Sequence, residues 1–390
     1  MIILKLNIQI FFERENMSTT KQNFSSRRMD IDPLFFKDAN ELAIKKLYSS
    51  EQDVLKKFKG LILLIVDGSQ VKLPNTRQTR EEFNVGLRAL KETKTPKARV
   101  SVMSDARNEF IIDSAISNIS LGESVLAFEH IEKADKIMDL SNSIVVFDRN
   151  YASTELIVQL LMKKSYFIFR LKSDTFKKER DRMKSDDECI EINLNSDRTR
   201  NIKNKEIKAK AKELRSLELR VVDIPLENGE IETLLTNLPE ELGTSDELKG
   251  LYGERWQVEK GYDVLKNKLH IENFSGKKRI SIEQDFYSQI LMYNILIEHK
   301  TNCNKELLEK SKNNEYEYEY KVNVNVLAGK LKSSLYEMFL APTEEERRLI
   351  KEEVHKLAKK NIIKVKKEVS TPRNKNILVS KYPYNNRKNF

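Results

Sequence analysis

The segment LILLIVDGS, residues 61–69, decides the fold class of this chain. Its first six side chains are all apolar, which is typical of a strand that is buried on both faces of a sheet. The run ends directly before Asp67, so we expect a carboxylate at the end of a central strand. A turn-capping role for Asp67 ahead of Gly68 is an alternative that the sequence leaves open.

Further apolar runs follow this strand along the chain. VSVM (100–103) and EFIIDSAI (109–116) predict two strands that complete an antiparallel meander with it. Helices and buried strands then alternate, at residues 123–134 (helix), 143–148 (strand), 151–165 (helix) and 166–171 (strand). Hairpin strands followed by such an alternation indicate an α/β fold with one mixed five-stranded sheet in ribonuclease-H-like order.

A second aspartate follows another buried strand. Asp148 ends the run SIVVFD, and the ends of neighbouring central strands meet at the edge where open α/β sheets usually carry their sites. Capping of the next helix is the structural alternative for Asp148. Asp105 and Asp263 are competing acids, but neither follows a buried strand as directly.

A third acid lies in the stretch LYGERWQVEKGYDVLKNKLHIENFSG, residues 251–276. Wound as one α-helix, this stretch places a row of four polar side chains within an arc of about 60°. The row consists of Tyr252, Arg255, Glu259 and Lys266, beside an apolar stripe of Leu251, Val258, Tyr262, Leu265 and Leu269. Such a helix docks on a core through its apolar stripe while it presents the polar row.

Two interpretations of Glu259 remain open. In the first, Arg255 and Glu259 form an ordinary ion pair on a surface helix. In the second, Glu259 binds a metal ion and its cationic and tyrosine neighbours hold phosphates. Two aspartates and a glutamate at one sheet edge would suit Mg²⁺, which prefers oxygen ligands. A pair of such ions supports phosphoryl transfer.

Composition limits the classes of protein that this chain can belong to. The 390 residues predict two or three domains, and a net charge of +10 favours a polyanionic partner. Cys189, Cys303 and four scattered histidines indicate neither a disulfide framework nor a zinc site, so we expect a reducing compartment, the cytoplasm. The opening MIILKLNIQIFF alternates like a strand and lacks the features of a signal peptide.

These motifs, taken in order, resemble a known enzyme family. Tyr252, Arg255, Glu259 and Lys266 match the Tyr-x2-Arg-x3-Glu-x6-Lys signature of DDE-type insertion-sequence transposases of the cut-and-paste group. Support comes from LIVDGSQVKLPNT (64–76), Asp148-Arg149-Asn150-Tyr151, LKNKLHIENFSG (265–276) and KYPYNNRKNF (381–390). The resemblance covers most of the chain from about residue 18.

The resemblance implies a role for each motif residue. It makes Asp67, Asp148 and Glu259 the catalytic metal ligands, for two Mg²⁺ ions with Mn²⁺ as a substitute. It makes Tyr252, Arg255 and Lys266 ligands of DNA phosphates. Arg149 and Tyr151 are expected either to contact DNA or to support the Asp148 loop.

The resemblance also implies a reaction and partners. Water nicks DNA at the transposon end, and the freed 3′ hydroxyl then acts as the nucleophile, often through a hairpin, until strand transfer. The expected partners are double-stranded DNA, as terminal inverted repeats and as target, and a second copy of the chain in a homodimeric synaptic complex. No membrane is expected, and the expected location is the bacterial cytoplasm, at the nucleoid.

The predicted domains follow these motifs. They are a short helical N-terminal arm with part of a DNA-binding region (1–57), the first part of the catalytic core (58–172), a β-rich insertion (173–240), the second part of the core with the Glu259 helix (241–300), and a helical C-terminal region (301–390). Residues 356–390 hold 11 Lys and Arg against one Glu, which predicts a solvated tail or a phosphate-tracking arm.

One departure from the family keeps other functions open. The segment STTKQNFSSRRMDIDP (18–33) resembles only the last part of the family's longer N-terminal DNA-binding region, so a decayed or truncated copy stays open as an alternative. Residues 1–16 are interpreted as an upstream extension of the frame that starts at Met17. The alternatives are a non-catalytic DNA-binding or inhibitory protein and a plain metal-dependent nuclease.

Overall fold

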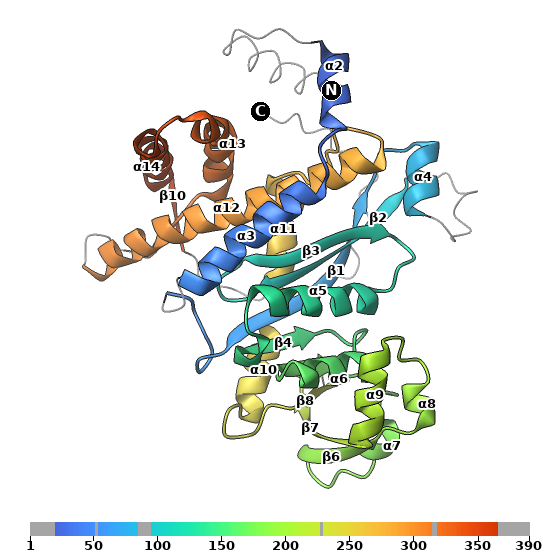
Figure 1. The fold of residues 1–390 in the computed structure, drawn as a ribbon. Coiled ribbons are helices and arrows are strands. Elements are labelled where there is room, and N and C mark those ends of the chain that lie inside the picture. The colour runs from blue at the N-terminus through green and yellow to red at the C-terminus, as the bar shows by residue number, and fades with distance from the viewer. Residues whose placement is uncertain (1–19, 51–53, 85–94, 227–228, 314–317, 366–390) are drawn as a thin grey trace. The chain divides into compact units, whose positions relative to one another are not determined.

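A mixed β-sheet of eight strands organises the larger of two compact units, Asp32–Ile297 (Figure 1). The computed structural model describes residues 20–50, 54–84, 95–226, 229–313 and 318–365. The strands are β1 (Ile62–Lys72), β2 (Lys97–Asp105), β3 (Ile111–Asn118), β4 (Ser143–Phe147), β5 (Tyr166–Arg170), β6 (Asp187–Asn193), β7 (Ser216–Pro225) and β8 (Ile231–Thr236). They lie in the order β3-β2-β1-β4-β5-β8-β7-β6.

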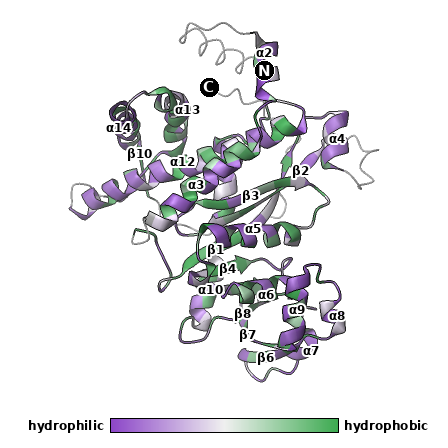
Figure 2. Ribbon diagram, viewed as in Figure 1, coloured by the Kyte–Doolittle hydropathy of each residue, from purple (hydrophilic) through white to green (hydrophobic). Residues whose placement is uncertain are grey.

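The first five strands confirm the predicted ribonuclease-H-like order. β1 pairs antiparallel with β2, β2 pairs antiparallel with β3, and β1 pairs parallel with β4. The apolar run that opens β1 is central, because Leu63, Leu64, Ile65 and Val66 have no exposed surface. Figure 2 shows that the strands of this core are mostly hydrophobic.

The predicted β-rich insertion extends this sheet rather than forming a separate one. β8 pairs antiparallel with β5, and β7 and β6 follow, so the sheet has eight strands where five were predicted for the core. The physical reason is the edge of β5, whose backbone groups would otherwise lack partners in the sheet. Pairing of Ile168 with Thr236 and of Arg170 with Leu234 satisfies that edge.

Helices cover the sheet, and one of them packs on its first three strands. The helices of this unit are α3 (Leu34–Ser50), α4 (Arg77–Phe83), α5 (Glu123–Ile137), α6 (Thr154–Met162), α7 (Lys177–Arg180), α8 (Ser196–Thr199) and α9 (Lys205–Leu214), with a short 3₁₀ turn at Leu140–Asn142. α5 packs on β1, β2 and β3. Its buried His130 lies 2.6 Å from Asp113 and 2.9 Å from Ser101, so polar contacts tie the helix to β2 and β3.

The stretch that we predicted as one helix is divided into three helical segments. α10 (Ser245–Gly253) and α11 (Trp256–Asp263) are joined by a tight turn, in which Arg255 N–H donates to the Tyr252 carbonyl at 3.0 Å. α11 then widens into a π-helical turn, Val264–Lys268. The prediction of one continuous α-helix was therefore wrong. The tight turn also carries Glu254, which pairs with Arg107 of the β2–β3 turn at 2.5 Å.

The second unit, Met1–Ile31 with Glu298–Phe390, confirms the predicted helical C-terminal region. Its elements are α2 (Lys21–Arg28), the end of α12 (Arg279–Lys312), α13 (Val324–Leu340), α14 (Glu344–Lys360), β9 (Tyr320–Val322) and β10 (Ile362–Lys364). The sequence analysis missed α14, because its buried positions Val354 and Ala358 stand among charged residues. His299 and His355 join α12 and α14 through ring nitrogens 2.8 Å apart.

Two predictions about the chain ends concern residues that the structure largely does not describe. The strand expected at residues 1–12 and most of the basic tail, residues 366–390, lie outside the described residues. The start of that tail, residues 356–360, is helical and belongs to α14. Among the described helices, none combines the length and the apolar character that crossing a bilayer requires.

Candidate active site

Asp67 and Asp148 are neighbours across the parallel pair of strands β1 and β4. The last residues in register are Val66 and Phe147, and each aspartate is the next residue of its strand's chain. Paired strands lie about 4.8 Å apart, so the two carboxylates start from adjacent backbones. Asp148 follows the end of β4 as predicted, but Asp67 does not end its strand: β1 continues to Lys72 because β2 remains paired with it.

The surroundings of Asp67 disfavour its negative charge. Burial raises the pKa of Asp67 to about 6, and the nearby carboxylates of Glu123 and Asp148 act in the same direction. The Arg255 guanidinium and the Gly68 N–H oppose this shift in the pKa. A group of carboxylates that crowd one another in a buried place has an affinity for added positive charge.

The residues of the polar row approach the two aspartates. The Tyr252 hydroxyl donates to Asp148 Oδ1 at 3.1 Å. Two residues away from Asp67 on β1, Ser69 Oγ lies 2.7 Å from Lys266 Nζ. Arg255 is half-buried, and burial by itself would lower its pKa. Tyr252, Asp148 and Asp67 outweigh this effect, so the pKa of Arg255 is raised. Three predicted residues therefore converge on the same edge of the sheet.

The third predicted acid, Glu259, has a cation as its neighbour. Its side chain is 40% exposed, and its nearest charge partner is Arg255, with Nη2 and Oε1 4.0 Å apart. Among the described residues, no three Asp, Glu, His or Cys side chains are placed to hold a metal ion together. Arg255 thus pairs with Glu259 and also lies near the two aspartates.

The two remaining motif residues differ in exposure. Arg149 follows Asp148 on the surface. Tyr151 is 1% exposed, and its hydroxyl is buried without a hydrogen-bond partner among the described residues. Tyr151 packs against Phe147 with ring centroids 5.6 Å apart, which favours support of the Asp148 loop over contact with DNA.

The purely structural roles considered for Asp67 and Asp148 are not seen, and the two competing acids have roles elsewhere. No turn follows Asp67, since β1 continues, and Ser153 rather than Asp148 caps α6. Asp105 is buried and accepts hydrogen bonds from Tyr48 and Asn108, so it organises the β2–β3 turn. Asp263 is exposed and accepts from Asn267 at 2.6 Å. Neither competing acid joins the aspartate pair.

Several residues near Asp67 escaped the sequence analysis. Glu123, the first residue of α5, packs against Gly68: a Cβ added there would lie 3.0 Å from the Glu123 carboxyl group. Arg99 pairs with Glu123 and also donates to the Ile119 carbonyl. No sequence spacing announces these residues. The Gly68 that directly follows Asp67 was the available sign, because a glycine in a strand indicates a close approach.

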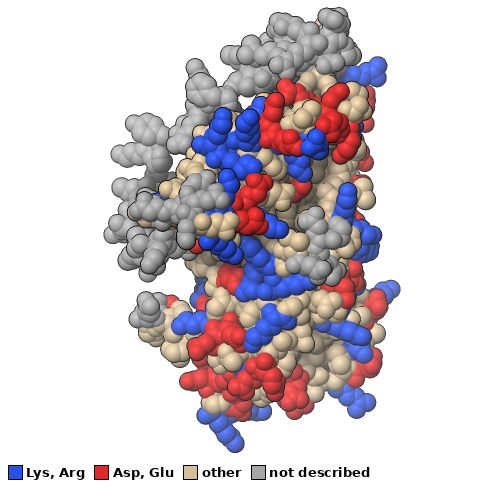
Figure 3. Space-filling model, turned by 90° about the vertical axis from the view of Figure 1, so that its left-hand side faces the viewer, with Lys and Arg blue, Asp and Glu red and all other residues tan. Residues whose placement is uncertain are grey.

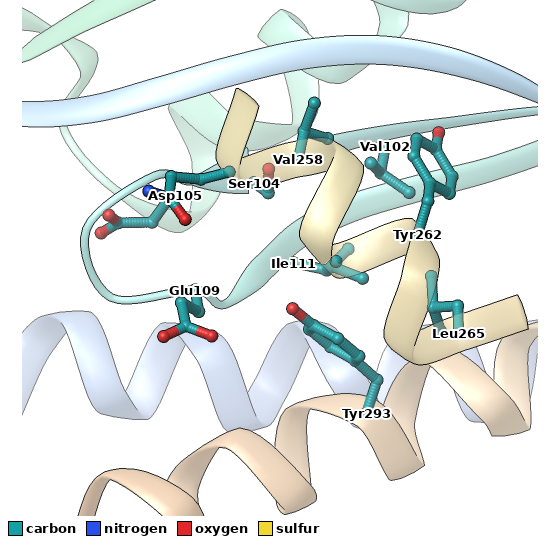
Figure 4. A pocket seen from close by; sticks show the side chains of 11 residues that line it. Val102, Ser104, Asp105, Glu109, Ile111, Val258, Tyr262, Leu265 and Tyr293 are labelled. Atoms are coloured by element: carbon teal, nitrogen blue, oxygen red, sulfur yellow. The ribbon is translucent and has the colours of Figure 1, made fainter. Parts of the chain in front are cut away.

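The buried side of α11 is packed against the sheet and α12. The Tyr262 hydroxyl donates to the Asp67 carbonyl at 3.0 Å. Figure 4 shows the small pocket that lies beside α11, with Tyr293 of α12 turned toward the helix. The Tyr293 hydroxyl would lie 3.3 Å from a Cβ on Gly261, so this glycine lets α12 approach α11 closely.

Positive charge alone does not locate a binding surface. Figure 3 shows one face of the molecule, on which Lys and Arg side chains are interspersed with Asp and Glu rather than gathered in one field. Individual contacts, and not a field of positive charge on this face, therefore define the site.

Comparison with known proteins settles the family. A family model described as "Transposase DDE domain" matches residues 59–295, which is more than half of the chain. This chain belongs to the DDE transposase family. DDE transposases are enzymes that act as nucleases and polynucleotidyl transferases, and the family in general depends on divalent metal ions.

Other comparisons add little to this assignment. No curated protein matches the chain. Among solved structures, the chain is similar to one titled "Cryo-EM structure of piggyBac transposase synaptic complex with hairpin DNA (SNHP)". The sequence identity is 13% and the TM-score 0.42, over 76% of this chain and 57% of that one. This DDE transposase thus spans little more than half the length of that structure.

Proposed function

We propose that this protein is a DNA transposase that cuts double-stranded DNA at transposon ends and joins the freed 3′ ends to target DNA. The observation that carries the proposal is the placement of Asp67 and Asp148 on adjacent strands within a DDE transposase domain. Arg255, before α11, and Lys266, in the π-helical turn after it, lie near the same edge. Carboxylates beside cations are what a site for phosphoryl transfer requires.

The aspartate pair fits a divalent ion. Two carboxylates supply oxygen ligands, and the raised pKa of Asp67 reflects a crowding that positive charge would relieve. Asp67 and Asp148 would hold two Mg²⁺ ions together with Glu259, and Mn²⁺ would substitute. Bound ions would activate the attacking oxygen and stabilise the leaving one.

The cations of the site bind and orient DNA in this proposal. Arg255 lies near both aspartates, and its guanidinium would neutralise phosphate oxygens of DNA at this edge. Tyr252 holds Asp148 in place, and Lys266 lies beside Ser69, where it adds positive charge near Asp67. Arg149 is exposed next to Asp148 and would contact the DNA backbone. Tyr151 would support the Asp148 loop.

A second function rests on the position of Glu259. Because Glu259 is paired with Arg255 and not gathered with the aspartates, a non-catalytic protein that binds or inhibits at transposon DNA is the alternative. Such a protein would keep the fold and the cations but not the cutting. In either function the partner is double-stranded DNA, and a homodimer in the synaptic complex remains our proposal.

Cutting by purified protein separates the two functions. The substrate is a duplex that carries the DNA flanking the gene, incubated with Mg²⁺ or Mn²⁺. We expect metal-dependent nicking by the wild type and its loss in Asp148→Asn, with DNA binding retained. The matched control is Asp263→Asn, an exposed acid outside the pair, which should nick like the wild type. Binding without nicking by the wild type would favour the non-catalytic function.

A further inference from the structure

The insertion holds an open pocket that the candidate active site does not use. The pocket lies between the end of β6, α8 and α9, with a volume of about 550 Å³. Figure 1 shows α8 and α9 side by side at this end of the sheet. Four cations line the pocket, and the other lining residues are Asn, Leu, Ser and Thr without any acid. The cations are Arg200, Lys208, Lys212 and Arg215.

The cations are placed by the local structure. Lys208 and Lys212 lie one turn apart on α9, each directly after one of its buried residues Ile207 and Ala211, so both face the same way. Lys208 Nζ also donates to the Arg200 carbonyl at 3.2 Å, which ties α9 to the segment after α8.

Arg215 reaches the pocket through an unusual backbone conformation. Its φ is +60°, a value that L side chains rarely adopt. Two backbone bonds hold it there: the Leu194 N–H donates to the Arg215 carbonyl at 2.7 Å, and the Arg215 N–H donates to the Ala211 carbonyl at 3.2 Å. The conformation ends α9 and places the guanidinium at the pocket wall.

These cations have few acidic partners. Arg200 lies 3.8 Å from Asp197, in a pair whose side chains are both mostly exposed. Among the described residues, no ion pair involves Lys208, Lys212 or Arg215. Their charge is therefore available to an anion from outside.

A second pocket of the insertion shows that this charge is local. It shares Asn193 with the first, but its charged lining is three glutamates and one arginine: Glu179, Glu188, Glu191 and Arg182. Phosphate would be repelled there and attracted by the basic pocket. Of these two adjoining pockets, the basic pocket is therefore the one that suits a polyanion.

We infer that the basic pocket binds phosphate groups of the DNA backbone and makes the insertion a second DNA contact, separate from the Asp67–Asp148 edge. The pocket is open, and its lysines are spaced along a helix, which suits a linear polyanion more than a small enclosed anion. The inference rests on the proposed function, because DNA is the polyanion that a transposase handles.

Binding of a plain duplex tests the inference without any cutting. Arg200→Gln with Lys212→Gln removes two pocket charges and keeps helix-compatible side chains. The matched control, Arg182→Gln with Lys210→Gln, removes one Arg and one Lys of the same insertion outside the basic pocket. The probe is a fluorescent 30-base-pair duplex in EDTA, titrated at several salt concentrations.

We expect the pocket variant to bind the duplex about tenfold more weakly and to lower the salt slope by about two, since two phosphate contacts are lost. The control should stay within about twofold of the wild type by the same reasoning. Equal losses in both variants would overturn the inference. Because nicking is not read, failure here is distinguishable from failure of the proposed function.

Two further measurements separate backbone-phosphate binding from a folding defect and from binding of a small anion. Arg215→Gly keeps the positive φ, since glycine adopts it without strain, and should weaken binding without lowering the melting temperature. Inorganic phosphate at 10 mM, measured by thermal shift, tests for a small anion. Stabilisation by phosphate that the pocket variant loses, together with unchanged duplex affinity, would assign the pocket to a small anion and overturn the DNA assignment.

Discussion

The two aspartates and Glu259 are carried by different kinds of structure. Asp67 and Asp148 extend from neighbouring strands whose register fixes their separation. Glu259 lies on α11, between a tight turn and a π-helical turn, with a side chain that is 40% exposed. The site therefore has a half in the sheet that strand register fixes, the fixed half, and a half on the helices that no register fixes, the adjustable half.

The largest expected effect tests whether the adjustable half completes the site. Glu259→Gln keeps the size of the side chain but removes its charge, so nicking should fall about a hundredfold or more while DNA still binds. The measurement is Mg²⁺-dependent nicking beside a binding assay at fixed salt. Undiminished nicking would show that Glu259 is not a ligand and that the fixed half acts without it.

The second prediction concerns the protonation of Asp67 in the fixed half. The pKa of Asp67 is raised by burial to about 6, so the folded state holds this proton more tightly than the unfolded state does. Stability of the metal-free protein should therefore fall as pH rises from about 4 to about 6, and stay lower above. Asp67→Asn removes this loss and should stabilise the protein by about 3 kcal/mol at pH 8.

Urea denaturation in EDTA at pH 4 and pH 8 measures this difference. Other buried acids titrate too, so the quantity to compare is the pH dependence of the variant minus that of the wild type. An Asp67→Asn protein whose stability at pH 8 equals or falls below that of the wild type would contradict the burial of a charged Asp67.

The third prediction tests the close approach of Glu123 to the strand that carries Asp67. In Gly68→Ala the new Cβ would lie 3.0 Å from the Glu123 carboxyl group, so Glu123 must shift and stability should fall by about 1 kcal/mol. The control is Gly250→Ala in α10, where a Cβ meets nothing within 4 Å and should stabilise the helix slightly. Thermal melting of both variants would decide. Equal melting temperatures would mean that Glu123 moves aside freely.

The smallest expected effect concerns Lys266 in the π-helical turn. Lys266→Ala should weaken DNA binding about equally for all sequences and lower the salt slope by about one unit. Ser69→Ala removes only the hydrogen-bond partner of Lys266 and should leave the salt slope unchanged. If both variants lose stability and neither changes the slope, Lys266 serves the fold of the adjustable half and not DNA.

The difference between the two halves also sets what a sequence can predict. Buried strands are recognisable because an apolar run such as residues 61–66 has few alternatives, and register then places Asp67 beside Asp148. The helix-borne residues obey a spacing, but spacing does not reveal where a helix tightens at Glu254 or widens at Val264. Those changes depend on partners distant in the chain, such as Arg107 for Glu254.

The same reasoning explains the residues that the sequence did not suggest. Glu123 and Arg99 meet near Asp67 only because α5 and β2 both border β1. The basic pocket forms where the end of β6 meets α9, which no local pattern announces. Sequence periodicity predicts elements and the faces of elements, whereas contacts between elements require the tertiary fold.

The pairing of β8 with β5 means that the insertion protects an edge of the core sheet. Without residues 173–240, the buried strand Tyr166–Arg170 would become a bare edge that is rich in aromatic residues and open to pairing with other chains. A shortened chain would then precipitate or form strand-exchanged oligomers, although every acid of the site is still encoded. Solubility of the core thus depends on a segment that contributes none of its catalytic groups.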